Sequence, residues 1–348
     1  MTTNSNELSA DEIALYDRQI RLWGMGTQLR LRSTKILIIN LGAIGTEVIK
    51  NLVLGGLNSI EILDNSTVKE EDFASQFFLP NDDKIIGEKK LPLVIGRIRE
   101  LNNRVNLSIN MKTLNEALQD EEYFKSFDLI IATEVEKDLL LQLNQLTRKL
   151  SIPLYVSGMH GMFAYIITDL IEHISTTEME AGNQSRKSGT QLSRNKIITS
   201  VSIDEKSKKE LVTITDHFTP ISEIFHSKEL PNQLNKRQLK RLSGALPLIF
   251  SLFEIPRPED PESIIDISLL KTKALDICER FNVPSTAVTD EYLDLFSRQA
   301  FAEFTPIAAV IGGAVAQDVI QFLSKKESPI NNVLILDSIK SEMPIYSL

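Results

Sequence analysis

A glycine turn between a short apolar run and a helix is the first feature of this sequence that could do chemistry. The run KILII (35–39) leads through Asn40 to Gly42 and Gly45, and an apolar helical stripe follows. Strand, glycine turn and helix in this order form the phosphate-binding unit of dinucleotide folds, in which the helix N-terminus binds the anion. The glycine fingerprint, however, expects another glycine where this chain has Asn40. The loop therefore predicts either a nucleotide site or a turn that keeps only the shape of one.

An acidic residue follows at the spacing that such folds use for the ribose. Asp64 comes directly after the second predicted strand (59–63), 19 positions beyond Gly45. An acid about 20 residues beyond the glycines binds ribose hydroxyls. The alternative is a strand-end carboxylate that caps a loop. Because these features do not separate a dehydrogenase from an ATP-using relative, a stand-alone NAD-binding Rossmann oxidoreductase is one hypothesis.

Arg18 is a second candidate, on the helix that precedes the first strand. A capping box formed by Ser9 and Glu12 predicts where this helix begins. Its apolar residues share one face at about 100° per residue: Ile13, Tyr16, Ile20 and Trp23. Arg18 projects from the opposite face, where its guanidinium could bind a phosphate through two hydrogen bonds. A lone helical arginine more often pairs with a nearby acid, so its spacing alone does not assign Arg18 a role.

The sequence positions of the other candidate nucleophile and bases, one cysteine and four histidines, indicate structural roles. Cys278 is the only cysteine, so the chain can form neither an internal disulfide nor a CxxC metal site. Leu270, Ala274 and Phe281 share its helical face, which predicts a buried thiol rather than an exposed nucleophile. His160 follows a predicted strand, and the four histidines show no metal-ligand spacing. We therefore expect no metal site in this chain.

Composition and charge narrow the possible partners. The 348 residues include 38 basic and 47 acidic side chains, and the resulting net charge of −9 argues against a nucleic-acid partner. The longest apolar stretch (307–323) contains Gln317 and Asp318, so we expect no membrane-spanning helix. The basic run NKRQLKR (235–241) is either a nuclear localisation signal or the solvated face of a helix.

Strands and helices alternate through much of the chain, and they must position these candidates. Predicted strands are 35–39, 59–63, 127–134, 153–158 and 331–337; predicted helices include 88–101, 138–150, 264–281 and 306–324. Such alternation implies right-handed crossovers and a mainly parallel sheet covered on both faces, as in a Rossmann-like α/β fold. Within 175–196 only three residues are apolar, so we expect a flexible insertion there. A hairpin should follow, in which Val201 and Ile203 face Val212 and Ile214.

These elements divide the chain into four predicted parts. They are an N-terminal helical arm (1–33), a Rossmann-like domain (34–174), a smaller α/β insert (175–300) and a C-terminal segment that completes the domain (301–348).

Three segments resemble one family. YDRQIRLWG (16–24) is similar to the N-terminal arm of the E1 enzymes, which are ThiF/MoeB-like proteins that activate ubiquitin-like proteins. DNSTVKEEDFASQFFL (64–79) resembles the stretch after the second strand in that family, and GGAVAQDVI (312–320) resembles its late helix. The resemblance covers nearly the whole chain and is strongest to the smaller, pseudo-adenylating subunits of SUMO-activating E1 enzymes. It implies the ThiF/E1 adenylation fold and a place in a heterodimer.

The resemblance also implies that the nucleotide site of this chain is degenerate. Where active members have an Asn and an Arg that bind ATP phosphates, this chain has Ala74 and Ser75. Where they have a magnesium-binding Asp-Asn pair, it has Glu134 and Val135, and the longer acid displaces the carboxylate from an ion that demands near-octahedral geometry. Lys90 still matches a lysine of the family. The expected remnant of the cofactor-binding site, which no longer functions, is Gly42, Gly45, Asp64 and Lys90.

For Arg18 the resemblance implies an active role. In the resembling enzymes the first arginine of the Tyr-x-Arg-Gln motif crosses the subunit interface and contacts ATP phosphates held by the partner. Arg18 would then act in trans, while ATP, Mg²⁺ and the thioester cysteine belong to the larger catalytic subunit. The resemblance further implies SUMO as the activated protein, a downstream SUMO-conjugating E2 enzyme and a nuclear location. Alternatives are an E1-like subunit for a different ubiquitin-like protein, a self-sufficient adenylating homodimer and a scaffold without catalytic input.

Overall fold

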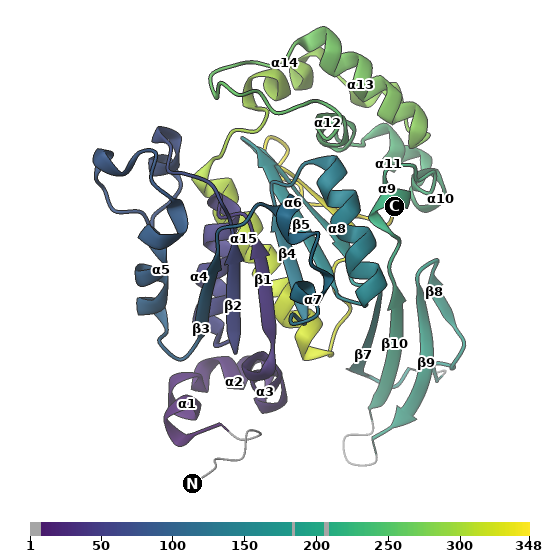
Figure 1. Cartoon of the computed structure of the whole chain (residues 1–348). Helices are drawn as coiled ribbons and strands as arrows, with labels where there is room; N and C mark the ends of the chain where they lie inside the picture. The colour runs from purple at the N-terminus through teal and green to yellow at the C-terminus, as the bar shows by residue number, and fades with distance from the viewer. Residues whose placement is uncertain (1–7, 183–184, 205–208) are drawn as a thin grey trace.

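An eight-stranded sheet forms the centre of the molecule (Figure 1). The computed structural model describes residues 8–182, 185–204 and 209–348. In spatial order the strands are β12 (Ile345–Tyr346), β11 (Val333–Asp337), β6 (Phe163–Asp169), β5 (Leu154–His160), β4 (Leu129–Thr133), β1 (Lys35–Ile39), β2 (Ser59–Leu63) and β3 (Asn106–Asn110). The five neighbouring strands β5, β4, β1, β2 and β3 run parallel to one another. On the other side of β5, the strands β6, β11 and β12 follow as antiparallel neighbours. The predicted mainly parallel α/β sheet is confirmed.

Alternating side chains of the central strands enter two separate cores. In β1, Ile36 and Ile38 join one apolar cluster, Leu37 and Ile39 join the other, and all four are fully buried. Because side chains alternate between the faces of a strand, a sheet covered on both faces requires such a continuous apolar run. The first cluster includes α4 (Ala43–Gly55), α5 (Lys90–Leu101) and α15 (Thr305–Ser324); the second includes α8 (Lys137–Leu150), α12 (Ala245–Leu252), α13 (Ile267–Arg280) and α14 (Asp290–Gln299).

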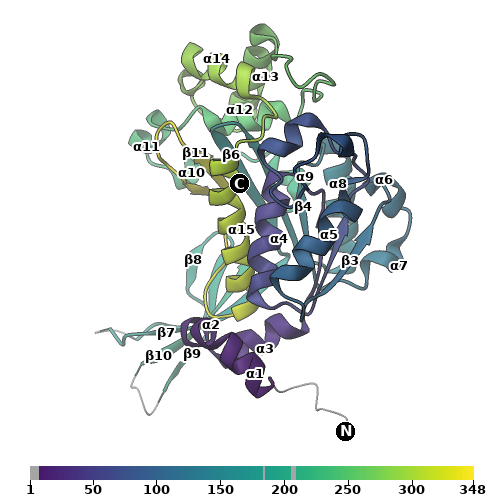
Figure 2. The ribbon, with the colours of Figure 1, turned by 90° about the vertical axis from the view of Figure 1, so that its left-hand side faces the viewer.

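Helix α15 packs directly against α4 (Figure 2). Gly312 permits this contact, because a Cβ there would lie 2.6 Å from the Cβ of Glu47. Asp318 ties α15 to the sheet, since it accepts hydrogen bonds from the Tyr155 hydroxyl (2.8 Å) and from the backbone N–H of Ile330 (3.0 Å). By length and hydropathy α15 could cross a membrane, but half of its most apolar window is buried inside the structure. This packing is that of a core helix.

A smaller four-stranded antiparallel sheet lies beside the main one (Figure 1). Its spatial order is β7 (Glu172–Met179), β10 (Glu210–His217), β9 (Lys196–Ile203) and β8 (Gln191–Ser193). The predicted hairpin is confirmed, with Val201 opposite Val212. Within the segment 175–196, where we expected a flexible insertion, residues 175–179 belong to β7 and pair with β10, residues 191–193 form β8, and the described residues between them lie in no strand. Backbone hydrogen bonds hold this sheet, and its small apolar cluster contains Ile198, Val212 and Ile214, with Met179 and Val201 packed against them.

The helices between 221 and 299 do not form a core of their own. Phe250 of α12 and Phe281 of α13 belong to the same apolar cluster as Leu37 and Ile39 of the main sheet. Short helices fill the connections: α6 (Leu114–Ala117), α7 (Glu121–Phe124), α9 (Ile221–Ile224), α10 (Leu230–Gln233) and α11 (Lys236–Lys240). Helix α11 lies within the basic run and exposes its basic side chains to solvent.

Candidate functional site

The loop after β1 keeps the shape of a phosphate loop. Asn40 has a φ of 67°, in the left-handed region where glycine is usual and asparagine is tolerated. Its Nδ2 donates a hydrogen bond to the carbonyl oxygen of Thr133 (2.7 Å), which fixes the turn against β4. A Cβ at Gly45 would lie 2.6 Å from the carbonyl oxygen of Asn40, so only glycine allows this close approach. Asn40 therefore does not by itself disable the loop.

An internal carboxylate occupies the N-terminus of α4. Glu303 accepts hydrogen bonds from the backbone N–H of Ala43 (2.8 Å) and from the hydroxyl of Ser75 (2.5 Å). A Cβ on Gly42 would lie 2.6 Å from Oε1 of Glu303, so the carboxylate lies directly against this glycine. A helix N-terminus binds anions through its free N–H groups and its dipole, and a nucleotide phosphate would bind here. Glu303 supplies that anion from within the chain.

Asp64 has the geometry of a loop cap. Its side chain is buried, and its two carboxylate oxygens accept hydrogen bonds from the backbone N–H groups of Leu41 (2.8 Å) and Ser66 (2.7 Å). Gln76 braces the same loop, because its Nε2 donates to the carbonyl oxygen of Leu41 (2.8 Å). Both oxygens of Asp64 thus bind the backbone, as the loop-cap alternative predicts.

Lys90 is held in an internal ion pair. Its Nζ lies 2.8 Å from Oδ1 of Asp72, and the two side chains are 8% and 10% exposed. The other oxygen of Asp72 accepts the backbone N–H of Lys69 (2.8 Å). Ala74 and Ser75, which follow in the same segment, carry no charge. The one cation that matches the family's phosphate ligands is therefore already neutralised by a neighbour.

Gly42, Asp64, Lys90 and Glu303 line one cavity of about 500 Å³ beyond the C-terminal ends of β1, β2 and β4. This is where doubly wound folds bind nucleotides. Its acidic side chains outnumber its basic ones: Asp64, Glu71, Asp72, Glu134, Glu259, Asp260 and Glu303 against Lys69, Lys90 and Arg257. An excess of negative charge repels phosphates. The described residues contain no cluster of three Asp, Glu, His or Cys side chains placed to hold a metal ion.

Glu134 borders the cavity as a protonated acid. Burial, with Glu303 nearby, raises the pKa of Glu134 to about 8 from the usual 4.5. Its Oε1 accepts the backbone N–H of Met159 (2.8 Å). At pH 7 most molecules therefore carry a neutral carboxyl at this position, and a neutral carboxyl is a poor ligand for Mg²⁺.

The protonation of Glu134 makes the stability of the protein depend on pH. The unfolded chain loses this proton near pH 4.5 and the native state near pH 8, so the native state loses stability as the pH rises through this window. His160, whose pKa burial lowers to about 3, is present in both proteins, so its contribution cancels from the difference between the wild type and Glu134→Gln. Between pH 6.5 and 8 we expect the free energy of unfolding of the wild type to fall by about 1–2 kcal/mol more than that of Glu134→Gln.

Urea unfolding at the two pH values measures this difference. The matched control is Glu136→Gln, at an exposed position two residues along the chain, which should keep the wild-type pH dependence. Identical pH dependence of the wild type and Glu134→Gln would show that Glu134 is ionised at neutral pH, contrary to this prediction.

Tyr16 anchors the N-terminal arm to the sheet domain. The arm consists of α1 (Ala10–Leu15), α2 (Asp17–Trp23) and α3 (Met25–Ser33). The Tyr16 hydroxyl accepts a hydrogen bond from Nδ2 of Asn102 (2.8 Å), and its ring lies where a Cβ on Gly56 would be, 2.5 Å from Cζ. The predicted single helix with Ile13 on its buried face is wrong. The helix breaks at Tyr16, and Ile13 is left 39% exposed.

Arg18 and Leu22 share an outward face of α2, because residues four apart on a helix lie on one side. Arg18 is exposed and forms no hydrogen bond or ion pair with any other residue that the structure describes. Leu22 is 79% exposed. Arg21, in contrast, pairs with Asp17 at 2.8 Å. A large apolar side chain beside a free guanidinium, on an anchored helix, is typical of a surface that another molecule covers.

Cys278 is a core residue, as predicted. It is 2% exposed within the apolar cluster of α12 and α13, and burial raises the pKa of its thiol to about 11. Almost no thiolate is present at neutral pH, so this thiol is not the nucleophile of a thioester reaction.

Comparison with known proteins gives a consistent family. The model of the ThiF family matches residues 16–348. The chain is 43% identical to the DNA damage tolerance protein RHC31 of Saccharomyces cerevisiae, with 99% of each chain covered. It is 30% identical to the DNA damage tolerance protein rad31 of Schizosaccharomyces pombe, again over 99% of each chain. It is 28% identical to SUMO-activating enzyme subunit 1 of Homo sapiens, over 96% of this chain and 94% of the human one.

Solved structures show a similar fold. Escherichia coli MccB, crystallised with succinimide, superposes with a TM-score of 0.54 and 13% sequence identity, over 95% of this chain and 71% of MccB. At this level of identity the likeness shows the fold alone.

Proposed function

Because this chain belongs to the ThiF family, we propose that it is the smaller, non-thioester subunit of a heterodimeric SUMO-activating E1 enzyme. A human relative that matches almost the whole chain is named SUMO-activating enzyme subunit 1, which supports this assignment over a subunit for another ubiquitin-like protein. The proposed reaction is the ATP-dependent adenylation of the SUMO C-terminus, followed by its transfer to a thioester on the larger subunit.

The contrast between Arg18 and the internal cavity carries the proposal. Glu303 fills the N-terminus of α4 and Lys90 is paired with Asp72, so the cavity of this chain is unsuited to a nucleotide. Arg18 is free and exposed on the arm. This combination fits a subunit that acts on a nucleotide held by its partner. It disfavours the NAD-binding hypothesis, because Asp64 caps a loop and Glu303 occupies the N-terminus of α4, where a pyrophosphate would bind.

In this mechanism Arg18 stabilises charge in trans. Adenylation joins the SUMO carboxylate to the α-phosphorus of ATP and releases pyrophosphate, so negative charge develops on the leaving oxygens. A guanidinium fixed near those oxygens lowers the barrier because it needs little reorganisation. Hydrogen bonds that hold the arm in place include the one from Asn102 to Tyr16 and the one from Nζ of Lys326 to the carbonyl oxygen of Trp23 (2.8 Å).

We place the larger subunit against the outward sides of α2 and α15. On α15, Val310 is 49% exposed, and a Cβ on Gly313 would meet nothing within 4 Å. Small side chains on that side allow another helix to approach closely. Arg30 of α3 joins the arm to the C-terminal end of α15 by donating to the carbonyl oxygens of Leu323 and Ser324 (both 2.6 Å).

The remaining partners follow from the same proposal. ATP and Mg²⁺ bind to the larger subunit, and a SUMO-conjugating E2 enzyme receives SUMO from its thioester. We propose a nuclear enzyme with a cytoplasmic pool, and the exposed basic side chains of α11 are compatible with nuclear import.

A thioester assay tests the division of labour between the subunits. With the larger subunit, ATP and SUMO present, we expect Cys278→Ser to support thioester formation at the parent rate, because the Cys278 thiol is buried. Non-reducing gels should place all of the SUMO thioester on the larger subunit. A SUMO thioester on this chain that disappears in Cys278→Ser would contradict the proposal.

A further inference from the structure

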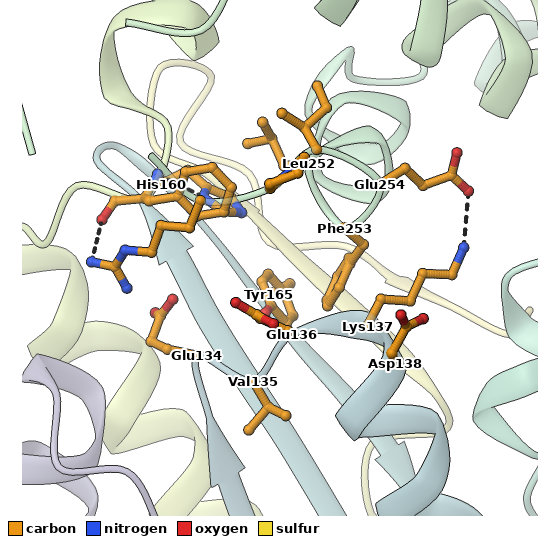
Figure 3. A pocket seen from close by; sticks show the side chains of 14 residues that line it. Glu134, Val135, Glu136, Lys137, Asp138, His160, Tyr165, Leu252, Phe253 and Glu254 are labelled. Atoms are coloured by element: carbon orange, nitrogen blue, oxygen red, sulfur yellow. Dashed lines mark hydrogen bonds and ion pairs between the residues drawn. The ribbon is translucent and has the colours of Figure 1, made fainter. Parts of the chain in front are cut away.

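Figure 3 shows a second cavity. It shares Glu134, Arg257 and Phe301 with the first cavity. Its volume is about 520 Å³, which is within the range of small-ligand sites. The turn between β4 and α8, the hairpin of β5 and β6, and the chain after α12 form its walls. Phe253 and Phe301 supply aromatic surface, and Leu252 and Ile255 supply aliphatic surface.

Two buried side chains bring unused hydrogen-bond donors to this cavity. Tyr165 is 3% exposed, and its hydroxyl has no hydrogen-bond partner among the described residues. His160 is 4% exposed, and its Nδ1 accepts the backbone N–H of Phe301 (3.0 Å). The neutral ring therefore has its proton on Nε2, which also has no described partner. Neither atom is fully enclosed, because neither is among the buried polar atoms that lack a partner, so both donors can reach an acceptor that enters the cavity.

The first turn of α8 adds further donors. Glu136 is the N-cap residue of this 14-residue helix, but its side chain makes no capping hydrogen bond. Residues 135–138 line the cavity, so the free backbone N–H groups of the first turn lie at its edge. Together with Tyr165 and His160, they favour a ligand that accepts hydrogen bonds.

The charges around the cavity argue against an ionised ligand. Lys137 is paired with Glu254 (2.9 Å), and Glu254 also binds Arg280 (2.6 Å). Glu136 and Asp138 are exposed on one side, where they would repel an anion. Arg257, whose guanidinium lies 6.0 Å from the centre of the Phe301 ring, would repel a cation. A neutral ligand avoids both penalties.

We infer that this cavity binds a small uncharged ligand with a planar ring and a carbonyl oxygen. The ring would pack against Phe253 and Phe301, and the carbonyl oxygen would accept a hydrogen bond from the Tyr165 hydroxyl. This site is separate from the trans action of Arg18 and does not depend on it.

Three probes of nearly the same shape test the inference on the full chain, alone and in its heterodimer. Benzamide is neutral, benzoate is an anion and benzamidine is a cation. Ligand-observed NMR titration should show the tightest binding for benzamide. Tyr165→Phe should weaken benzamide binding about 3- to 10-fold, since one hydrogen bond is lost. The matched control Tyr123→Phe removes a hydroxyl that binds Glu61 elsewhere on the surface, and it should leave benzamide binding unchanged.

Circular dichroism and thermal unfolding would verify that both variants keep the fold. The inference is overturned if none of the probes binds, or if benzoate or benzamidine binds at least as tightly as benzamide. It is overturned equally if Tyr165→Phe binds benzamide with wild-type affinity. A benzamide signal in the wild type that Tyr165→Phe weakens, with Tyr123→Phe unaffected, supports it.

Discussion

Replacing Arg18 with alanine is expected to lower the rate of ATP–pyrophosphate exchange by the assembled heterodimer about 10²–10³-fold. The reason is that Arg18 supplies a fixed cation to phosphates held by the other subunit, and removing one such donor from a preorganised site raises the barrier directly. Arg18 has no partner among the described residues, so its loss should leave this chain's fold and stability unchanged. Initial rates at saturating ATP and SUMO measure the effect.

The matched control for Arg18 is on the same helix. Arg21 is also exposed, but it pairs with Asp17, and such surface pairs contribute little. The heterodimer with Arg21→Ala should therefore catalyse ATP–pyrophosphate exchange within about twofold of the parent rate. If Arg18→Ala assembled normally and exchanged as fast as Arg21→Ala, Arg18 would be an ordinary surface residue.

Replacing Leu22 with aspartate is expected to weaken assembly with the larger subunit on the order of 100-fold or more. The substitution removes apolar surface that the partner would bury and places an unpaired charge in the interface. Leu22 is 79% exposed in this chain, so the fold of the isolated chain should not change. Titration of a labelled larger subunit gives the dissociation constant directly.

A second exposed apolar residue provides the control for Leu22. Ile264 is 67% exposed and precedes α13, which lies at the opposite end of the molecule from the arm (Figure 1). Ile264→Asp should bind the larger subunit with wild-type affinity. Equal losses for Leu22→Asp and Ile264→Asp would show a general effect of surface charge and would argue against an interface on α2.

Much of the sheet domain could be predicted because its signals are local. The buried run at 35–39, the glycines that follow it and the helix at 306–324 each depend on a few neighbouring residues. The burial of Cys278 could also be predicted, since its helical face is apolar at the spacing of a core helix. In each case one segment contains the whole signal.

The closure of the cavity could not be predicted, because it depends on contacts across the chain. Glu303 binds Ala43 from 260 positions away, and no spacing rule connects the two. Sequence comparison with active members identified what Ala74 and Ser75 lack, but it could not show which group fills the vacated position. The same holds for Lys90, whose pairing with Asp72 appears only when η1 (Glu70–Ala74) folds over the start of α5.

The helical arm and the start of the segment 175–196 differ from the prediction for physical reasons that the structure makes clear. The apolar periodicity of the arm predicted one helix over 10–23. In the structure the helix is interrupted at Tyr16, which packs against Gly56, and Ile13 lies toward solvent. In the segment 175–196 low hydrophobicity suggested flexibility, although residues 175–179 are ordered by backbone pairing with β10. Tertiary contacts outweighed local pattern in both places.

ATP–pyrophosphate exchange by this chain alone, by the larger subunit alone and by the heterodimer, each with SUMO, tests the central claim most directly. The claim is that this chain holds no working nucleotide site, because Glu303 fills the N-terminus of α4, and instead acts on its partner's nucleotide. We predict no exchange above background by this chain alone and full exchange by the heterodimer. Exchange of labelled pyrophosphate into ATP by the purified chain alone would contradict the account.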